Sequence, residues 1–406
     1  MKDRPTILQI IPQLDAGGAE LSTVEIAEAI VRAGGRAIVL SEPGRLTPRL
    51  QAVGAEAIAF PAATKNPIQM LANAAAIARM VQTEGVDLVH ARSRAPAWSA
   101  LIAARRRRVP FVTTYHGAYG ETNALKNLYN GVMARGDVVI ANSRYTADLI
   151  ASRYATPRSR IQVVHRGVDC RAFDPGAIAP DRVARLRQSW GVAQHQRIVL
   201  HAARLTRWKG QGVLIDAVAE LARQGKWQKA VAVLAGDAQG RTGYVQELQA
   251  QIEGAGLQDH VRLVGHVEDI AAAYLAAHVT VVASTEPEAF GRAAAEAAAL
   301  GCPVIATEIG APSEIVLAQP FAANAQITGW LVPPGDAGKL ASTLGEALAL
   351  SPQERADMGM RARQRVLANF TTASMQHQTL AVYDRLLGTP LAARFAGNTE
   401  HQHSLT

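Results

Sequence analysis

A chain of 406 residues is long enough for two domains of ordinary size. Its composition, with 49% hydrophobic and only 19% charged residues, is typical of packed globular proteins and excludes a largely disordered chain. No run approaches the ~18 apolar residues of a membrane span, no apolar signal-peptide core follows Met1, and Cys170 and Cys302 form neither a zinc-binding nor a disulfide pattern, so we expect a protein of the reducing cytoplasm. The net charge of +8 is uneven, because residues 1–190 carry 25 Lys and Arg against 15 Asp and Glu, whereas residues 191–406 carry 17 against 19.

The first half of the chain alternates short β-branched runs with amphipathic stretches of helical length. This alternation is typical of parallel sheets covered by helices, so it predicts the α/β class. In chain order, strands are predicted over Thr6–Ile11, Arg36–Leu40, Glu56–Ala59, Leu88–Ala91, Phe111–Thr114, Val138–Asn142 and Ile161–Val164. Between them, helices are predicted over Ala19–Ala33, Ile68–Thr83 and Trp98–Arg106.

The alternation stops in a Pro- and Gly-containing segment at 174–180, so we place a domain boundary near residue 190. The second domain, 191–370, repeats the pattern. Its predicted strands are Ile198–Ala202, Ala230–Leu234, Val261–Val264, Val279–Ala283 and Val304–Ala306. We expect a helix over 371–388 that packs back on the first domain, and a disordered tail over 389–406, where the chain becomes polar.

The first segment suited to chemistry is Gly17-Gly18, where the first strand meets the first helix. Paired glycines there let backbone N–H groups approach a phosphate at the positive end of a helix. A tight turn without a ligand uses Gly-Gly as readily, so this motif alone is not specific.

The second segment contains two glutamates eight residues apart, Glu288 in a loop and Glu296 in a run of alanines. Small residues around Glu296 imply close packing, and a buried carboxylate is costly unless it has partners. We expect both carboxylates to face one pocket. The alternative for Glu296 is a solvent-facing position on the outer side of its helix.

The third segment places Arg204 and Lys209 after the first strand of the second domain. A guanidinium and an ammonium at that edge of a sheet can together neutralise a diphosphate leaving group. Basic residues after a strand are usually only solvated, but the glutamate pair favours the functional interpretation here.

In their order and spacing, these segments resemble the GT-B retaining glycosyltransferases of family 4 along nearly the whole chain. The resemblance is carried by Gly17-Gly18, Gly167-Val168-Asp169, Arg204, Lys209-Gly210, the pair Glu288 and Glu296, the run Gly301 to Ala306 and Gly335-Asp336. It implies two doubly wound Rossmann-like domains that face each other across a cleft. The first domain would receive the acceptor, and the second would bind a nucleotide-diphospho-sugar donor.

The same resemblance implies a role for each matching residue. Glu296 would bind the donor ribose and Glu288 the transferred sugar, while Arg204 and Lys209 would hold the diphosphate. The implied catalytic residues are His116, Arg204, Lys209 and Glu288. The implied donor-binding residues are Gly17, Gly18, Arg204, Lys209, Glu288, Ala289, Phe290, Gly291 and Glu296. Without the resemblance, a histidine placed after a strand, as His116 is, would more often be structural.

Three positions depart from the family pattern. The segment 309–314 has one glycine where the family usually has two before the glutamate, which puts the local sugar contacts in doubt. Arg292 stands where relatives are often apolar, and it can read an acidic sugar or a phosphate, or pair with Glu288. His165-Arg166 replaces the common Pro-Asn before Gly167, and the sequence offers no functional account of that change.

The sequence contains no Asp-x-Asp triplet and no His/Asp cluster with metal-ligand spacing, so we expect no cofactor and no metal ion. Arg204, Lys209 and helix N-termini would take the role that Mg²⁺ plays elsewhere in stabilising the departing diphosphate. Retention with no carboxylate in an obvious nucleophile position implies that the acceptor attacks from the face that the leaving group vacates.

Basic residues of the first half point to anionic partners. Arg92 and Arg94 follow a strand and are expected on the acceptor side, where they would hold a phosphorylated lipid or a core oligosaccharide. The run Arg105–Arg108 closes the next helix, where membrane adhesion and a solvated helix terminus are both open. The basic half favours an anionic membrane surface, with a solvated arginine-rich surface as the alternative, and no nucleic acid is expected.

The expected function is therefore sugar transfer to a glycan or lipid-linked acceptor of the cell envelope, such as a lipopolysaccharide core, a glycolipid or an exopolysaccharide intermediate. The expected location is the cytoplasm, peripheral on the inner face of its membrane. A GT-B nucleotide-sugar epimerase or hydrolase and a non-catalytic nucleotide-sugar-binding protein remain alternatives. A nicotinamide-dependent oxidoreductase is disfavoured, because the first turn lacks the third glycine of GxGxxG.

Overall fold

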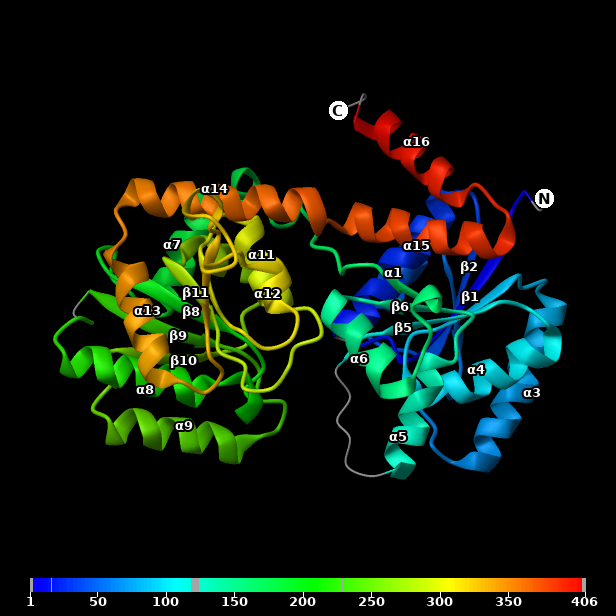
Figure 1. The fold of residues 1–406 in the computed structure, drawn as a ribbon, viewed down its shortest axis with the longest axis horizontal. Coiled ribbons are helices and arrows are strands. Elements are labelled where there is room, and N and C mark those ends of the chain that lie inside the picture. Colours follow the sequence, from blue (N-terminus) through cyan, green and yellow to red (C-terminus); the bar gives the residue numbers. More distant parts are fainter. Residues whose placement is uncertain (1–2, 16, 118–123, 228, 404–406) are drawn as a thin grey trace. The chain divides into compact units, whose positions relative to one another are not determined.

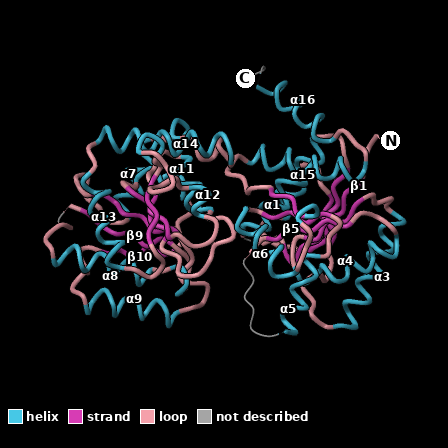
Figure 2. Tube along the Cα trace, viewed as in Figure 1, coloured by secondary structure: helices cyan, strands magenta, loops and turns pink. Residues whose placement is uncertain are grey.

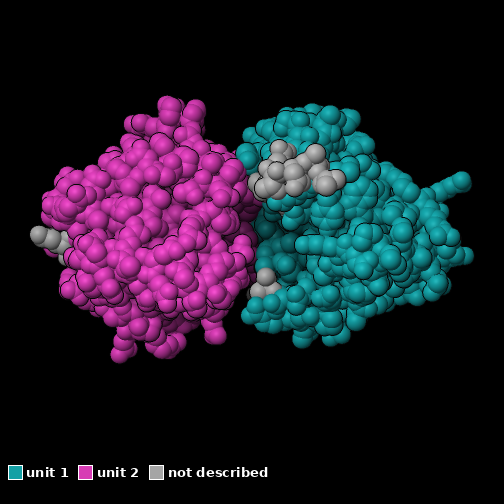
Figure 3. All heavy atoms as spheres, turned by 90° about the horizontal axis from the view of Figure 1, so that it is seen from below, with its two compact units in different colours: residues 1–167, 372–406 teal, residues 168–371 magenta. Residues whose placement is uncertain are grey.

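The computed structural model describes residues 3–15, 17–117, 124–227 and 229–403, and its helices and strands are drawn in Figure 1. The chain divides into two compact units, coloured separately in Figure 3. Unit 1 holds residues 1–167 and 372–406, and unit 2 holds residues 168–371. Each unit has its own parallel sheet and its own buried apolar clusters, so each is an α/β domain in itself.

The division falls after Gly167, so the boundary expected near residue 190 is misplaced. The segment that follows belongs to unit 2 because it pairs with that unit's own elements. The Val168 N–H donates to the Phe370 carbonyl at 2.8 Å, and Arg182 forms a bidentate ion pair with Asp269. Trp190 is buried in the apolar core of unit 2.

Unit 1 contains a seven-stranded sheet in the order β3-β2-β1-β4-β5-β6-β7, with every described pairing parallel. Its strands are β1 (Thr6–Gln13), β2 (Arg36–Glu42), β3 (Glu56–Ala59), β4 (Leu88–Ala91), β5 (Phe111–Tyr115), β6 (Val138–Ala141) and β7 (Ile161–Val163). The strand order reverses between β1 and β4, and the carboxyl ends of strands at such a switch point are where doubly wound sheets bind ligands.

Helices cover both faces of this sheet, as Figure 2 shows. The helices of unit 1 are α1 (Gly18–Arg32), α2 (Thr47–Ala52), α3 (Pro67–Thr83), α4 (Arg94–Arg107), α5 (Ala124–Asn130), α6 (Arg144–Tyr154), α15 (Thr372–Leu387) and α16 (Leu391–His403). Local sequence sets their ends: Asn66, for example, caps α3 by accepting the N–H of Ile68 at 2.9 Å, and a proline follows it.

The C-terminal helices α15 and α16 are part of unit 1. The Tyr383 hydroxyl lies 2.6 Å from Nδ1 of the buried His90, and Gln376 donates to the Glu25 carbonyl at 2.7 Å. The expectation of a disordered tail is wrong as far as the end of α16. Leu391 and Phe395 are spaced one helical turn apart and are buried in the same apolar cluster as α1, which a solvated tail could not achieve.

Unit 2 contains a six-stranded parallel sheet in the order β10-β9-β8-β11-β12-β13, with its switch point between β8 and β11. Its strands are β8 (Arg197–Ala202), β9 (Ala230–Ala235), β10 (Val261–Gly265), β11 (Val279–Val282), β12 (Val304–Thr307) and β13 (Gly329–Val332). Its helices are α7 (Pro180–Ser189), α8 (Gln211–Arg223), α9 (Thr242–Gly254), α10 (Ile270–Ala276), α11 (Arg292–Ala299), α12 (Pro312–Ile315), α13 (Ala337–Ala349) and α14 (Pro352–Asn369).

Among the described strands, β13 is the one that the sequence analysis did not predict. It has only four residues and begins with glycine, which weakens intrinsic strand preference, yet Gly329 pairs with Val304 on the edge of the sheet. A separate finding concerns the helices: among the described residues, none is both long and apolar enough to cross a membrane.

Candidate functional site

Two loops meet at the switch point of unit 2. One loop follows β8 and the other follows β11, and their backbones touch at Gly210. A Cβ on Gly210 would lie 1.9 Å from the Ala283 carbonyl oxygen, and the residue has φ +75°, so only glycine permits this approach. The Thr285 N–H donates to the Trp208 carbonyl at 2.7 Å and fixes one loop on the other.

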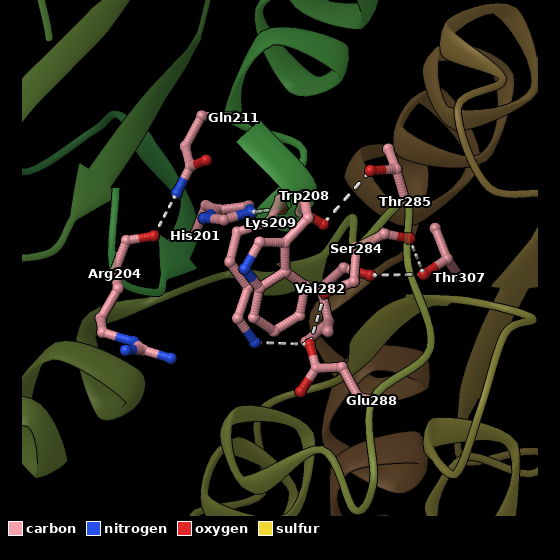
Figure 4. A network of polar contacts seen from close by, with 10 residues as sticks. All are labelled: His201, Arg204, Trp208, Lys209, Gln211, Val282, Ser284, Thr285, Glu288 and Thr307. Atoms are coloured by element: carbon pink, nitrogen blue, oxygen red, sulfur yellow. Dashed lines mark hydrogen bonds and ion pairs between the residues drawn. The ribbon is translucent and has the colours of Figure 1, made fainter. Parts of the chain in front are cut away.

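These loops place Lys209 against Glu288, as Figure 4 shows. The Lys209 Nζ lies 2.7 Å from Oε1 of Glu288, which also accepts a hydrogen bond from the Ser284 hydroxyl. The ammonium also stands 4.2 Å from the centre of the Trp208 ring. The side chains are only 16% and 10% exposed, so each charge needs the other as long as no ligand replaces it.

His201, at the end of β8, supports the backbone of this pair. Its Nε2 lies 2.9 Å from the Lys209 carbonyl oxygen, so the ring donates from that nitrogen. Burial lowers the pKa of His201 to about 4, and the imidazole is therefore neutral near pH 7. Sequence reasoning missed this residue. A histidine inside an apolar strand one short loop before the lysine was the available signal.

Arg204 has a fixed backbone and an exposed side chain. Its carbonyl accepts from the amide of Gln211 at 2.9 Å, and the Tyr244 hydroxyl donates to the same amide group at 3.1 Å. In Figure 4 the Arg204 guanidinium and the Lys209 ammonium extend toward the same side of the network. The two cations are thus positioned from one short segment, as the sequence predicts, with Lys209 paired and Arg204 exposed.

The backbone of Glu288 is fixed by the segment that departs from the family pattern. The Ala311 N–H donates to the Glu288 carbonyl at 2.9 Å, and a Cβ on Gly310 would lie 2.4 Å from that carbonyl oxygen. Gly310 has φ +78°. The single glycine is therefore the one that the close approach to Glu288 requires.

Glu296, on α11, is buried with partners and does not face solvent. It is 7% exposed, and its Oε1 accepts from the Arg292 guanidinium at 2.5 and 3.0 Å. The Tyr274 hydroxyl lies 3.5 Å from Oε2. Arg292 therefore pairs with Glu296, and the alternative in which it pairs with Glu288 is wrong: residues four apart on one helix lie on the same face, whereas Glu288 already has Lys209. Gly291, which follows the predicted donor-binding residues Ala289 and Phe290, has φ +92° and caps α11.

In unit 1, Gly17 caps α1, and the Arg166 guanidinium lies directly on Gly18, where an added Cβ would be 2.5 Å from Nη1. Both ring nitrogens of His116 are buried, with no hydrogen-bond partner among the described residues. Burial and the nearby charges of Arg92 and Arg166 hold the pKa of His116 well below its usual range, so this imidazole is also neutral.

The two arginines predicted on the acceptor side separate in the structure. Arg92 is 3% exposed and donates to the Ser22 hydroxyl, whereas Arg94 is part of α4 and donates to Asn130 at 2.8 Å. Within the run at the end of α4, Arg105 pairs with Asp137 at 2.7 Å, so part of that run has structural partners. Sequence spacing could not show this, because Arg92 lies in the turn after β4 whereas Arg94 begins α4, and side-chain direction follows a different period in a helix than in a strand.

Metal coordination has no visible basis in the part of the chain that the structure describes. No group of three or more His, Cys, Asp or Glu residues there is arranged to hold an ion.

Comparisons with known proteins agree with this geometry. Residues 16–172 match the model of Glycosyltransferase Family 4, and residues 183–365 match that of Glycosyl transferases group 1. The chain is 31% identical to a D-inositol 3-phosphate glycosyltransferase of Xylanimonas cellulosilytica, over 86% of each chain. A glycosyltransferase structure from Rickettsia africae superposes with a TM-score of 0.86 at 32% identity, covering 95% of this chain and 99% of that one. Anabaena Alr3699/HepE in complex with UDP and glucose has a TM-score of 0.78 at 28% identity, covering 93% and 99%.

Proposed function

This chain belongs to the group 1 glycosyl transferases and uses a nucleotide sugar, and we propose that it transfers the sugar, with retention, to a glycan or lipid-linked acceptor of the cell envelope. The observation that carries the proposal is the pair of cations at the switch point of unit 2. Lys209 is held against Glu288, and the exposed Arg204 lies on the same segment. Two cations at the carboxyl ends of parallel strands suit a diphosphate leaving group.

In the proposed reaction, the bond between the anomeric carbon and the distal diphosphate oxygen breaks while the acceptor hydroxyl attacks from the same face. The electron pair leaves with the nucleoside diphosphate, whose growing negative charge Arg204 and Lys209 neutralise. The acceptor proton passes to the departing phosphate oxygen. Glu288 positions the Lys209 ammonium and contacts the transferred sugar. Because Arg204 and Lys209 neutralise the negative charge of the departing diphosphate, the proposed reaction requires no metal ion.

Glu296 is proposed to bind the ribose hydroxyls of the donor. Its Oε1 is occupied by Arg292, while the one contact of Oε2 within the described part of the chain is the 3.5 Å approach of the Tyr274 hydroxyl, which leaves acceptor capacity for hydroxyl donors. By the resemblance to the family, His116 and Gly17-Gly18 of unit 1 are also proposed to contact the donor.

The first donor to test is UDP-glucose, because the Anabaena relative is described in complexes with UDP, glucose and UDP-glucose. A panel of UDP, GDP and ADP sugars would be screened by thermal shift, since a ligand at 100 times its Kd adds about 2.7 kcal/mol of stability. Transfer to an acceptor extract with an unchanged anomeric configuration, read by NMR, supports the proposal. Donor hydrolysis or epimerisation at full rate without acceptor would contradict it.

The acceptor is proposed to lie at the inner face of the cytoplasmic membrane. Unit 1 carries 23 basic and 14 acidic residues, whereas unit 2 carries 19 and 20. Each basic residue near an anionic surface contributes about 1 kcal/mol, so a handful on one face gives measurable affinity. The full chain should sediment with phosphatidylglycerol vesicles at low salt and be released at 1 M salt, where screening shortens to about 3 Å. A chain that stays in the supernatant at low salt would indicate a soluble acceptor.

A further inference from the structure

The Ser284 hydroxyl, in the loop after β11, is a partner of Glu288 that the proposed reaction does not use. It donates to Oε1 of Glu288, the same oxygen that lies 2.7 Å from the Lys209 ammonium (Figure 4). Ser284 is 1% exposed, whereas the Lys209 side chain is partly exposed. A ligand that arrives from solvent can therefore compete with Glu288 for the ammonium, but it cannot compete for the serine hydroxyl.

Ser284 is itself held by Thr307, the buried last residue of β12. The Thr307 hydroxyl donates to the Ser284 carbonyl at 2.7 Å and lies 3.4 Å from the Val282 carbonyl oxygen. Strands β11 and β12 pair in parallel, so this contact ties the loop after β11 to the neighbouring strand of the sheet. The sheet thus fixes the point from which the Ser284 hydroxyl reaches Glu288.

The balance of charge around Glu288 changes when a diphosphate binds, because the Lys209 ammonium then faces two anions. A largely buried carboxylate is costly when its cation is drawn away, unless another donor remains. Among the described residues, the donors to the Glu288 carboxylate are Lys209 and Ser284. Ser284 is therefore the donor that stays with Glu288 while the ammonium serves the diphosphate.

We propose that Ser284 is a positioning residue for the transfer reaction, whose hydroxyl holds the Glu288 carboxylate in one orientation while Lys209 serves the departing diphosphate. Thr307 is a second positioning residue, since it fixes the backbone of Ser284. This proposal rests on the proposed function, in which Lys209 stabilises the leaving group and Glu288 contacts the transferred sugar. The alternative is a role in loop stability alone, which predicts the same loss of stability with and without Lys209.

Kinetics of the full-length Ser284→Ala variant test the role in transfer, with UDP-glucose or the donor that the thermal-shift panel selects. The kcat should fall by roughly 10- to 100-fold, because a hydrogen bond to a charged acceptor is lost. The Kd of UDP, which lacks the transferred sugar, should change by less than about threefold in calorimetry, since a positioning residue acts on the reaction more than on nucleotide binding.

Ser99→Ala is the matched control. Ser99 is equally buried, and its hydroxyl donates to the Met70 carbonyl at 2.8 Å in unit 1, so this variant loses a buried hydrogen bond without touching the pair. Its kcat should equal that of the wild type. A folded Ser284→Ala that keeps more than about half of the wild-type kcat would overturn the proposal, and so would a loss of UDP affinity as large as the loss of kcat.

Thr307→Val tests the second positioning residue, because it keeps the shape of the side chain and removes the hydroxyl. The kcat should fall by less than in Ser284→Ala, and Thr307→Ser, which keeps the hydroxyl, should restore it. Thr280→Val is the control, since Thr280 is a buried threonine of β11 whose hydroxyl lies 3.4 Å from the Cys302 sulfur. If Thr307→Val had the same kcat as Thr280→Val, the role of Thr307 would be overturned.

A double-mutant cycle tests the proposal without turnover. Lys209→Met removes the ammonium at a similar side-chain length and so imitates its withdrawal by a diphosphate. Ser284→Ala should lower the melting temperature by more in the Lys209→Met background than in the wild type, and equal shifts in both backgrounds would overturn the proposal. Failure of the proposed function is distinguishable, because it would appear as an absence of nucleotide and nucleotide-sugar binding by the wild type, whereas the cycle would still decide whether Ser284 holds Glu288.

Discussion

The polar centres of the two units differ in whether their buried polar groups have partners. In unit 2 the partly buried Lys209 already has a carboxylate, since its ammonium lies 2.7 Å from Glu288, and Glu296 likewise has Arg292. In unit 1, by contrast, Arg92 and Asn142 keep buried N–H groups without partners among the described residues. A ligand of unit 2 must therefore share or exchange existing pairs, whereas a ligand of unit 1 would supply partners that are missing.

The largest effect is expected from Lys209→Ala, which breaks the unit 2 pair. The substitution removes a cation that is proposed to stabilise the leaving group. The loss of one such electrostatic stabiliser lowers kcat by a factor of roughly 10²–10³. Steady-state kinetics with the donor found in the screen would measure it, with the exposed Lys226→Ala at the far end of the sheet as a control. If the folded variant retained more than a tenth of wild-type kcat, Lys209 would have no place in the transition state.

Acid should destabilise the protein through its buried neutral histidines. The pKa of His201 is lowered to about 4 by burial, below the ~6.5 of an unfolded chain, so its stabilising contribution is present above pH 6.5 and lost as the pH falls toward 4. The loss is on the order of 3 kcal/mol for this residue. Denaturant melts between pH 7 and 4.5 would measure it. If the free energy of unfolding of a His201→Gln variant fell with decreasing pH as steeply as that of the wild type, this assignment would be contradicted.

Glu296→Ala should weaken donor binding by roughly 1.5–3 kcal/mol for each ribose hydrogen bond that is lost. It also leaves Arg292 without its carboxylate. Calorimetry with the cognate nucleotide is the measurement, and Glu253→Ala, an exposed glutamate of α9, is the matched control. An unchanged dissociation constant in a folded variant would remove Glu296 from the site.

Arg292→Leu should have a smaller effect than the loss of Glu296 itself. The guanidinium is 38% exposed, and pairs of this kind on one helix contribute less than about 1 kcal/mol. The nucleotide Kd should rise by no more than fivefold, with kcat unchanged, because the variant only releases the Glu296 carboxylate. A large drop in kcat would instead show that Arg292 contacts the substrate.

Removal of metal should have no effect. Because Arg204 and Lys209 are proposed to neutralise the diphosphate, turnover in EDTA should equal turnover without it. Activity that EDTA abolishes and Mg²⁺ or Mn²⁺ restores would show that the paired lysine of unit 2 is not sufficient.

The segments that could be predicted were those with a local signal. The twelve predicted strands are all present, because β-branched runs between turns fix them locally, while the four-residue β13 depends on its pairing with β12. The motifs put Lys209 and Glu288 among the same candidate residues, and the structure pairs their side chains, but the motifs did not point to His201, which contacts the Lys209 backbone.

By itself, the sequence determined the α/β class, the family and the segments that carry the proposed chemistry, because hydrophobic period and motif spacing are local properties of the chain. Only the tertiary structure decided which charges are partners: that Arg292 serves Glu296, that Arg92 and Arg94 separate, and that Arg166 lies on Gly18. It also decided that Gly167 ends unit 1 and that α16 joins this unit in place of the expected disordered tail, whereas the return of the helix over 371–388 was predicted from the sequence. The physical reason is that pairing and burial depend on side-chain direction and on contacts between residues distant in sequence, which no local pattern records.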